Sequence, residues 1–230
     1  MLDLAAGTGS NLRYLADRLT GEQRWLLVDH DPALLAEARR RTSRDRPAYH
    51  IDTREMDLAG LTVAVRGMFD GRALVTASAL LDLVSEDWLR ALAARCRESG
   101  SAVLFALSYD GRMQCSPEES GDRAVRDLVN LHQRTDKGFG PALGAGATDA
   151  AVRCFAELGY HMRREPSDWT LTPEQTALQR ELIDGWADAA LAIVPGQHVM
   201  IEEWRRRRLA HVEARRSRVI VGHEDLAGWL

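Results

Sequence analysis

The residues best suited to chemistry lie near the start of the chain, where two glycines precede an acid. Gly7 and Gly9 stand between an apolar run, Leu2–Ala5, and a predicted helix, Ser10–Leu19. Glycine lets the backbone adopt dihedral angles closed to other residues, so a ligand can lie directly against the main chain. The free N–H groups at the start of the helix would point at that ligand. Asp29 follows a second apolar run, roughly twenty residues on, and could accept both hydroxyls of a ribose. The spacing predicts a nucleotide-cofactor site.

The third glycine of a dinucleotide site is missing. A pyrophosphate needs a glycine three positions after Gly9, where the helix packs on the strand, and Leu12 stands there. The sequence instead has an acid, Asp3, four positions before Gly7, with Ala5 between them. This arrangement resembles the first motif of class I S-adenosylmethionine-dependent methyltransferases, acid-x-Gly-x-Gly-x-Gly, with Ala5 in place of the first glycine. The resemblance implies that this loop holds the methionine half of S-adenosyl-L-methionine.

The same resemblance assigns roles at the ends of the following strands. It implies that Asp29 holds the ribose, that Asp57 lies near the adenine amino group, and that the segment from Ser78 to Asp82 borders the transferred methyl group. His30 is expected to line the adenine pocket or to face solvent. Two alternatives stay open, because Asp57 could be a solvated turn residue and Asp82 a loop acid that caps a nearby amide. The predicted cofactor-binding residues are Asp3, Ala5, Gly7, Gly9, Asp29, His30, Asp57 and Ser78.

Strands and helices alternate along the chain in the pattern of an α/β fold. Apolar runs predict buried strands at Arg72–Ser78 and Ala102–Ser108, and alternating polarity predicts an exposed edge strand at Tyr49–Met56. Helical spacing and capping residues predict helices at Pro32–Arg41 and Ser85–Arg97. We therefore expect a Rossmann-like doubly wound sheet, mostly parallel, with its central strand at the N-terminus.

The C-terminal half continues the alternation as part of a single domain of residues 1–230. The predicted elements are a helix at Asp149–Leu158, a strand at Tyr160–Glu165, helices at Pro173–Ile193 and Gln197–Arg216, and a short strand at Arg218–Gly222. The resemblance implies that this final strand inserts antiparallel beside the fifth. The helical pair at 173–216 is longer than the family needs, so we expect it to form a lid or the surface of a homodimer.

Residues 109–148 form a segment longer than a simple crossover, and we predict a substrate-side insertion there. A glycine-punctuated loop in it carries two cations, Arg134 and Lys137, and one acid, Asp136, which indicates attraction for a carboxylate or phosphate. His132 is the candidate catalytic base, because an unperturbed imidazole titrates near neutrality. A surface loop that merely ends a helix is the alternative. The predicted substrate-binding residues at this edge of the sheet are Asp82, Tyr109, Arg134 and Lys137.

Composition bounds the class of protein. The chain has 230 residues and a formal net charge of -4, which argues against a nucleic-acid-binding domain. It contains no run of about eighteen apolar residues and no charged-then-apolar leader, so we expect a cytoplasmic protein without a membrane span. Neither the three cysteines nor the histidines show the spacing of a metal site. The arginines at 205–208 share their predicted helix with acids, which favours a solvated face over an RNA-binding one.

In the resembled family one or two helices normally precede the first strand and close over the cofactor, whereas this chain starts at that strand. We expect either a longer natural chain or another element over the site. The predicted function is methyl transfer from S-adenosylmethionine to a small, acidic, soluble molecule. The alternatives are a nicotinamide-dependent oxidoreductase, which Leu12 disfavours, and a non-catalytic S-adenosylmethionine-binding partner of another enzyme.

Overall fold

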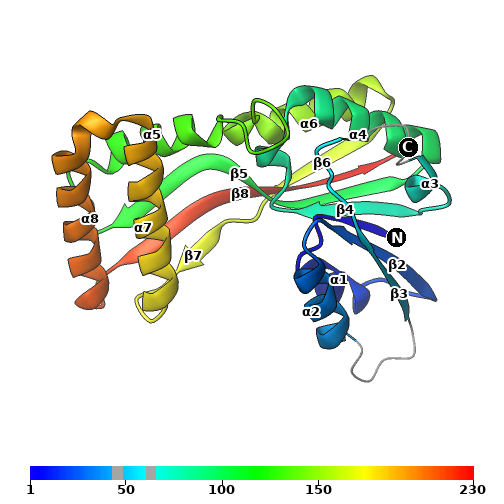
Figure 1. Cartoon of the computed structure of the whole chain (residues 1–230), viewed down its shortest axis with the longest axis horizontal. Helices are drawn as coiled ribbons and strands as arrows, with labels where there is room; N and C mark the ends of the chain where they lie inside the picture. Colours follow the sequence, from blue (N-terminus) through cyan, green and yellow to red (C-terminus); the bar gives the residue numbers. More distant parts are fainter. Residues whose placement is uncertain (43–48, 61–65) are drawn as a thin grey trace.

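One sheet runs through the computed structural model, which describes residues 1–42, 49–60 and 66–230 (Figure 1). Within these residues the strand order is β3-β2-β1-β4-β5-β8-β6, and β7 pairs with β8 beside this path. The strands from β1 to β5 are parallel to their neighbours, whereas β8 is antiparallel to β5, β6 and β7. The strands are β1 (Leu2–Leu4), β2 (Gln23–Asp29), β3 (Tyr49–Glu55), β4 (Leu74–Ser78), β5 (Ala102–Ser116), β6 (His161–Pro166), β7 (Trp169–Leu171) and β8 (Arg218–Trp229).

The predicted fold class is confirmed. β1 is the central strand, with β2 and β4 on its two sides, and β3 forms the edge as its alternating polarity predicts. Leu2 and Leu4 are fully buried because helices cover both faces of a doubly wound sheet. The final strand lies antiparallel beside β5, as the family resemblance implies.

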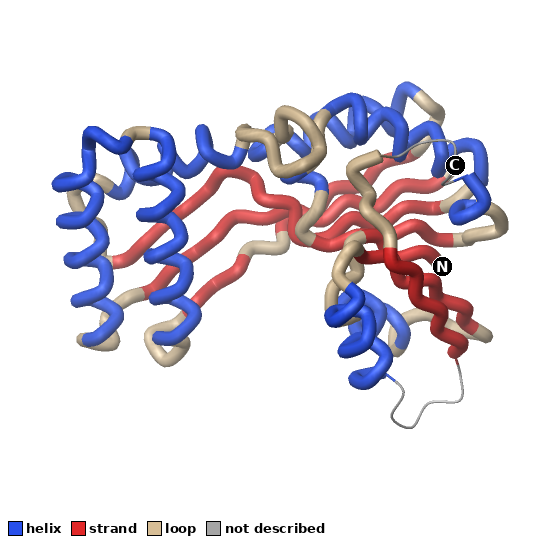
Figure 2. The backbone as a smooth tube through the Cα atoms, in the orientation of Figure 1, coloured by secondary structure: helices blue, strands red, loops and turns tan. Residues whose placement is uncertain are grey.

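Helices cover the sheet in two layers (Figures 1 and 2). α1 (Ser10–Ala16) and α2 (Pro32–Thr42) lie on one face, and α3 (Arg66–Phe69), α4 (Glu86–Ser99) and α6 (Ala147–Glu157) on the other. The bounds of α4 follow from its caps, since the Ser85 hydroxyl accepts the Trp88 N–H and Gly100 adopts the left-handed conformation. Apolar side chains form a separate core on each side of the sheet.

The fifth and last strands are much longer than their patterns predict. β5 continues to Ser116 instead of ending at Ser108, and β8 runs to Trp229 instead of Gly222. The register of this pair shifts twice, between Phe105 and Ser108 and between Tyr109 and Met113. Such bulges bend a strand and interrupt the alternation of its side chains, which is why the apolar pattern ends too early. Sequence analysis also missed β7.

A further group of helices packs on the long β5 and β8 strands, seen on the left of Figure 1. α5 (Asp122–Gln133), α7 (Thr176–Ile193) and α8 (His198–Glu213) pack against this extension around their own core, which includes Val125, Ile183 and Trp204. The predicted insertion at 109–148 therefore begins with eight residues of strand, Tyr109–Ser116. The predicted pair of helices at 173–216 supplies two sides of the second core. Their role as a lid or dimer surface stays a prediction.

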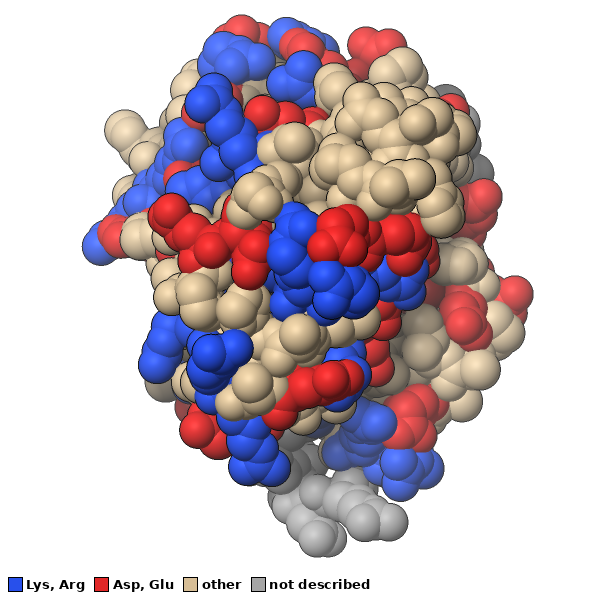
Figure 3. Space-filling view, turned by 90° about the vertical axis from the view of Figure 1, so that its left-hand side faces the viewer, with Lys and Arg blue, Asp and Glu red and all other residues tan. Residues whose placement is uncertain are grey.

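The four consecutive arginines of α8 are paired with carboxylates. Arg205 lies 2.6 Å from Asp184, Arg206 2.7 Å from Glu203, and Arg207 2.9 Å from Glu119. The expected solvated face is wrong for Arg208, which is fully buried and pairs with Asp122 at the start of α5. Positive and negative side chains accordingly alternate on the face in Figure 3. None of the helices in the described ranges is long and apolar enough to cross a membrane.

Candidate functional site

The glycine loop joins β1 to α1 with three residues in the left-handed conformation. Ala5, Gly7 and Gly9 have φ angles of 50°, 51° and 74°. A Cβ on Gly9 would lie 3.2 Å from the Cβ of Ala38, so this glycine lets α2 pack closely against the loop. A Cβ on Gly7 would meet no atom within 4 Å, so the space beside Gly7 is open to a ligand. The two glycines therefore serve different purposes, one for packing and one for ligand approach.

Asp29 and Gly7 are in direct contact at the ends of β2 and β1. The Gly7 N–H donates to Oδ2 of Asp29 at 2.8 Å, and the Asp31 N–H donates to Oδ1 at 3.0 Å. Asp29 is only 5% exposed, so its carboxylate is held at the end of β2. The His30 imidazole is 80% exposed, and its Nδ1 lies 3.4 Å from Oδ1 of Asp29. His30 therefore faces solvent, which was the second of its two expected positions.

Asp3 lies beneath the loop. It is fully buried in β1, and Oδ1 accepts a hydrogen bond of 3.1 Å from Nδ2 of Asn11. Nδ2 of Asn11 also donates to Oγ1 of Thr76 at 2.8 Å, which links α1 to β4. Oδ2 of Asp3 has no hydrogen-bond partner among the described residues. Burial raises the pKa of Asp3 to about 7, although the hydrogen bond from Asn11 lowers it. Sequence analysis missed Asn11, whose signal was a polar residue directly after the loop.

The two acids predicted after β3 and β4 have different environments. Asp57 is exposed, and its Oδ1 accepts the Ala59 N–H at 2.8 Å, as a turn residue would. Asp82 lies in a short 3-10 turn, η2 (Leu81–Leu83), where it is 6% exposed and its Oδ1 has no partner in the described part of the chain. Burial raises the pKa of Asp82 to about 6, against backbone hydrogen bonds that include one from Tyr109. The structure thus brings Asp82 to Tyr109, just beyond Ser78 at the end of β4.

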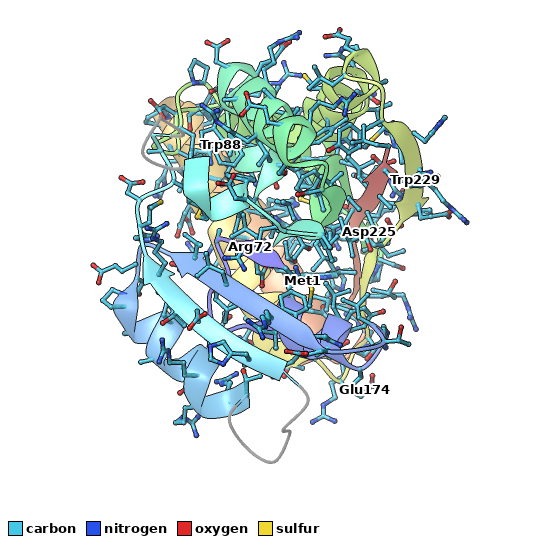
Figure 4. The ribbon with its side chains drawn as sticks, turned by 90° about the vertical axis from the view of Figure 1, so that its right-hand side faces the viewer. Met1, Arg72, Trp88, Glu174, Asp225 and Trp229 are labelled. Atoms are coloured by element: carbon cyan, nitrogen blue, oxygen red, sulfur yellow. The ribbon has the colours of Figure 1, made fainter. Side chains whose placement is uncertain are left out.

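The loop after α5 docks beside Asp82. The Leu143 N–H donates to the Val84 carbonyl at 2.9 Å. The ring of Phe139 meets Trp88 edge-on, with 5.6 Å between the centroids. Trp88 lies on the face of the sheet away from α1 and α2 (Figure 4). These contacts hold the loop at the carboxyl edge of the sheet, where the doubly wound topology places ligands.

The acid of this loop is hydrogen-bonded to the backbone, whereas its two cations, Arg134 and Lys137, have no carboxylate partner among the described residues. Oδ1 of Asp136 accepts the N–H groups of Gly138 and Gly140, at 2.7 and 3.0 Å. Nζ of Lys137 donates to Oγ1 of Thr135 at 3.0 Å and lies 3.4 Å from Nδ1 of His132. Burial and this neighbouring cation lower the pKa of His132. Neither Arg134 nor Lys137 forms an ion pair with a carboxylate of the described residues.

Sequence analysis missed two aromatic residues that lie next to Tyr109. His223 stands opposite Tyr109 in the β5–β8 ladder, and their ring centroids are 6.2 Å apart. The Trp169 ring lies 5.1 Å from His223 on its other side. The Tyr109 hydroxyl donates to Oδ1 of Asn130 on α5 at 2.8 Å. No local pattern could have paired these residues, because the sequence analysis ended both strands before the ladder reaches this point.

Comparison with known proteins finds a family match over the N-terminal residues and similar folds over the whole chain. Residues 1–100 match the family model of a methyltransferase domain. The cyclopropane synthase MmaA2 from Mycobacterium tuberculosis has a similar structure, with 10% identity, a TM-score of 0.52, and coverage of 100% of this chain and 77% of that one. A putative methyltransferase (BH2331) from Bacillus halodurans C-125 has 12% identity, a TM-score of 0.51, and coverage of 99% and 89%. No curated protein has a matching sequence.

The fold and the motif together define the class of protein. The first hundred residues match a methyltransferase domain, and the whole chain has the fold of the similar structures. The resemblance inferred from Asp3, Gly7, Gly9 and Asp29 is confirmed for residues 1–100, which match a methyltransferase domain, and the cofactor that it implies is S-adenosyl-L-methionine. The open space beside Gly7 and the buried carboxylate of Asp29 fit this cofactor.

Proposed function

We propose that this enzyme methylates a small molecule that carries an anionic group, and that Arg134 and Lys137 bind this group. The observation behind the proposal is the docked loop, in which Asp136 is occupied by backbone N–H groups. The two cations have no carboxylate partner among the described residues. An arginine offers a planar fork of donors that matches a carboxylate or phosphate, whereas a lysine offers a point charge.

Each part of the site has a distinct task in this proposal. Asp29 receives the ribose hydroxyls, the open side of Gly7 admits the methionine half of the cofactor, and Ser78 borders the methyl group. Asp57 and His30 are proposed to lie at the solvent-facing rim of the adenine site, since both side chains are exposed. When bound, S-adenosylmethionine supplies an activated methyl group on a sulfonium. The protein contributes mainly by positioning, which can supply about 7 to 11 kcal/mol of a reaction barrier.

The acceptor side of the site consists of Asp82, Tyr109 and the cationic loop. His132 is the base predicted from the sequence, and it shares this loop with Lys137. We also propose that the enzyme acts in the cytoplasm on a diffusible substrate and not on nucleic acid. Support for this comes from the net charge of -4 and from the acids that pair with the arginines of α8. α7 and α8 are proposed as the contact surface of a homodimer.

Calorimetry with S-adenosylhomocysteine tests the cofactor half. Asp29→Ala removes a charged acceptor, and hydrogen bonds to charged groups contribute about 1.5 to 3 kcal/mol, so affinity should fall roughly ten- to a hundredfold. Asp70→Ala, at an exposed acid away from the loop, is the matched control. Unchanged affinity in Asp29→Ala would remove Asp29 from the site, and tighter binding of a nicotinamide dinucleotide would overturn the assignment of the cofactor.

A double variant tests the acceptor half. Arg134→Ala with Lys137→Ala should raise KM for acidic acceptors, with 4-hydroxybenzoate and a phosphorylated phenol as probes, and leave affinity for S-adenosylhomocysteine nearly unchanged. Arg123→Ala is the control, since its side chain is 88% exposed and lies on the first turn of α5. Equal KM values for the double variant and the wild type would make this loop a surface connector.

A further inference from the structure

Four side chains from four segments form a row across the sheet where β5 leaves β4. The last β4–β5 pair is Ser78 with Ala106, and Tyr109 follows three residues later. On one side of Tyr109 lies Asp82, which its backbone N–H contacts. On the other side lies His223, 6.2 Å away between ring centroids, followed by Trp169. We call Asp82, Tyr109, His223 and Trp169 the transverse row. It lies at the carboxyl end of β4, the end at which ligands bind in this topology.

The tautomer of His223 follows from its hydrogen bond. Nδ1 lies 3.0 Å from the Val221 carbonyl oxygen, which can only accept, so Nδ1 carries the proton in the neutral ring. Nε2 is then the basic nitrogen. No described residue hydrogen-bonds Nε2, and it is not among the buried side-chain atoms that lack a partner, so it reaches solvent from a residue that is only 8% exposed. Nε2 is therefore free to accept a proton, and the hydrogen bond from Nδ1 to the Val221 carbonyl fixes the orientation of the ring.

The carboxylates around His223 are engaged by groups other than its ring, and Oδ1 of Asp168 accepts the backbone N–H of His223 at 3.2 Å. Asp110 and Asp168 both bind Arg112, at 2.6 Å each. Oδ1 of Asp225 accepts the Leu107 N–H at 2.8 Å. None of these carboxylates forms a hydrogen bond to the His223 ring. Burial outweighs the charges of these carboxylates and the hydrogen bond to the Val221 carbonyl, and it lowers the pKa of His223 below its usual value of 6.5. The imidazole is consequently neutral at pH 7.

We propose that Nε2 of His223 accepts the proton of the methyl acceptor, and that the acceptor atom is therefore an O–H oxygen or N–H nitrogen. This inference rests on the proposed methyl transfer. The acceptor lone pair forms the new bond to the methyl carbon, the carbon–sulfur bond breaks, and its electron pair stays on sulfur as the neutral thioether. The acceptor proton passes to Nε2, and the resulting imidazolium returns it to water. An acceptor that carries an aromatic ring could pack against Trp169, which is 40% exposed.

His223 suits this role better than His132. Nδ1 of His132 lies 3.4 Å from Nζ of Lys137, and a cation at that distance opposes the positive charge that a base must gain. His223 instead has three carboxylates nearby, Asp110, Asp168 and Asp225, which favour a positive charge once a proton arrives. The ring that gains its positive charge close to carboxylates is the better proton acceptor during turnover.

The test compares His223→Gln with His132→Gln and with His198→Gln, an exposed histidine at the start of α8. The probes are 4-hydroxybenzoate and 4-aminobenzoate, which combine a carboxylate with an O–H or N–H acceptor. Product is measured as S-adenosylhomocysteine formed, and cofactor affinity is measured by calorimetry. In His223→Gln, kcat should fall about 10²- to 10⁴-fold, the range of general-base catalysis, with KM and cofactor affinity nearly unchanged. Wild-type kcat should fall as the pH drops through the lowered pKa of His223, a dependence that His223→Gln should lose.

Several results would overturn the inference while leaving cofactor binding intact. The first two are a normal kcat in His223→Gln and a loss of kcat confined to His132→Gln. The third is that wild-type protein binds S-adenosylhomocysteine but methylates neither probe. The fourth is a ¹⁵N NMR spectrum that places the His223 proton on Nε2 at pH 7.5. Failure to bind S-adenosylhomocysteine would instead refute the proposed function itself, so the two failures are distinguishable.

Discussion

Replacing Asp3 by asparagine should stabilise the protein at alkaline pH. The carboxylate of Asp3 is fully buried in the central strand, and one of its oxygens has no partner among the described residues. Burial raises its pKa to about 7. An asparagine has the same shape and keeps the oxygen that accepts from Asn11, but it never ionises. The variant therefore removes a buried negative charge from the folded state.

The sign and size follow from proton linkage. An unfolded aspartate has a pKa of about 3.9, so below that value both states are protonated and the charge has no effect. As the pH rises toward the folded pKa of about 7, the unfolded chain ionises first and wild-type stability falls. The full difference corresponds to roughly 4 kcal/mol as an upper value. The new amide N–H groups lack a partner, which costs about 1 to 3 kcal/mol. We expect a net gain of about 1 to 3 kcal/mol at pH 8, and a value about 2.5 kcal/mol lower at pH 5.

Urea unfolding followed by tryptophan fluorescence at pH 5 and pH 8 measures this difference. Asp70→Asn, at an exposed acid, is the control and should shift stability equally at both values. The reasoning about Asp3 would be refuted by a variant that is less stable than the wild type at pH 8, or by a difference that does not depend on pH.

Three further substitutions test the backbone and the second core, each by urea unfolding. Ala5→Gly should raise the free energy of unfolding by about 0.5 to 1 kcal/mol. The φ angle of Ala5 is 50°, so glycine relieves roughly 1 to 2 kcal/mol of backbone strain, and the larger entropy of glycine in the unfolded chain offsets part of this gain. A loss of stability would contradict this reasoning. Gly222→Ala would push a Cβ into the Asp110 carboxylate and should lower the free energy of unfolding by about 1 to 3 kcal/mol. Gly196→Ala is the control and should be nearly neutral, because a Cβ there would meet no atom within 4 Å. Equal effects of the two substitutions would count against close packing at Gly222. Arg208→Met breaks the buried ion pair between α8 and α5 and should cost about 3 kcal/mol, so wild-type stability in this variant would show that the pair contributes nothing.

Several features of the site could be predicted from local sequence alone. Gly7 and Gly9 mark a turn between a strand and a helix, because both adopt the left-handed conformation that glycine favours. Asp29 ends a run of apolar residues, so its position at the carboxyl edge of the sheet follows from strand direction. The caps of α4, Ser85 and Gly100, fixed its bounds within a residue or two. These features depend on interactions within about twenty residues of chain, which a sequence pattern records.

Contacts between distant segments were decided by the tertiary structure. One carboxylate oxygen of Asp3 has no hydrogen-bond partner among the described residues because of the way α1 and β4 pack around β1. The length of β5 and β8 depends on two bulges whose register shifts break the alternation that predicts strands. His223 reaches Tyr109 only through that ladder, across 114 positions of sequence. Residue types and local spacing thus predicted the fold class, the glycine loop and the position of Asp29, the acid proposed to bind the ribose. The contact between Tyr109 and His223 was decided only by the antiparallel pairing of β5 and β8, because long-range register has no local signal.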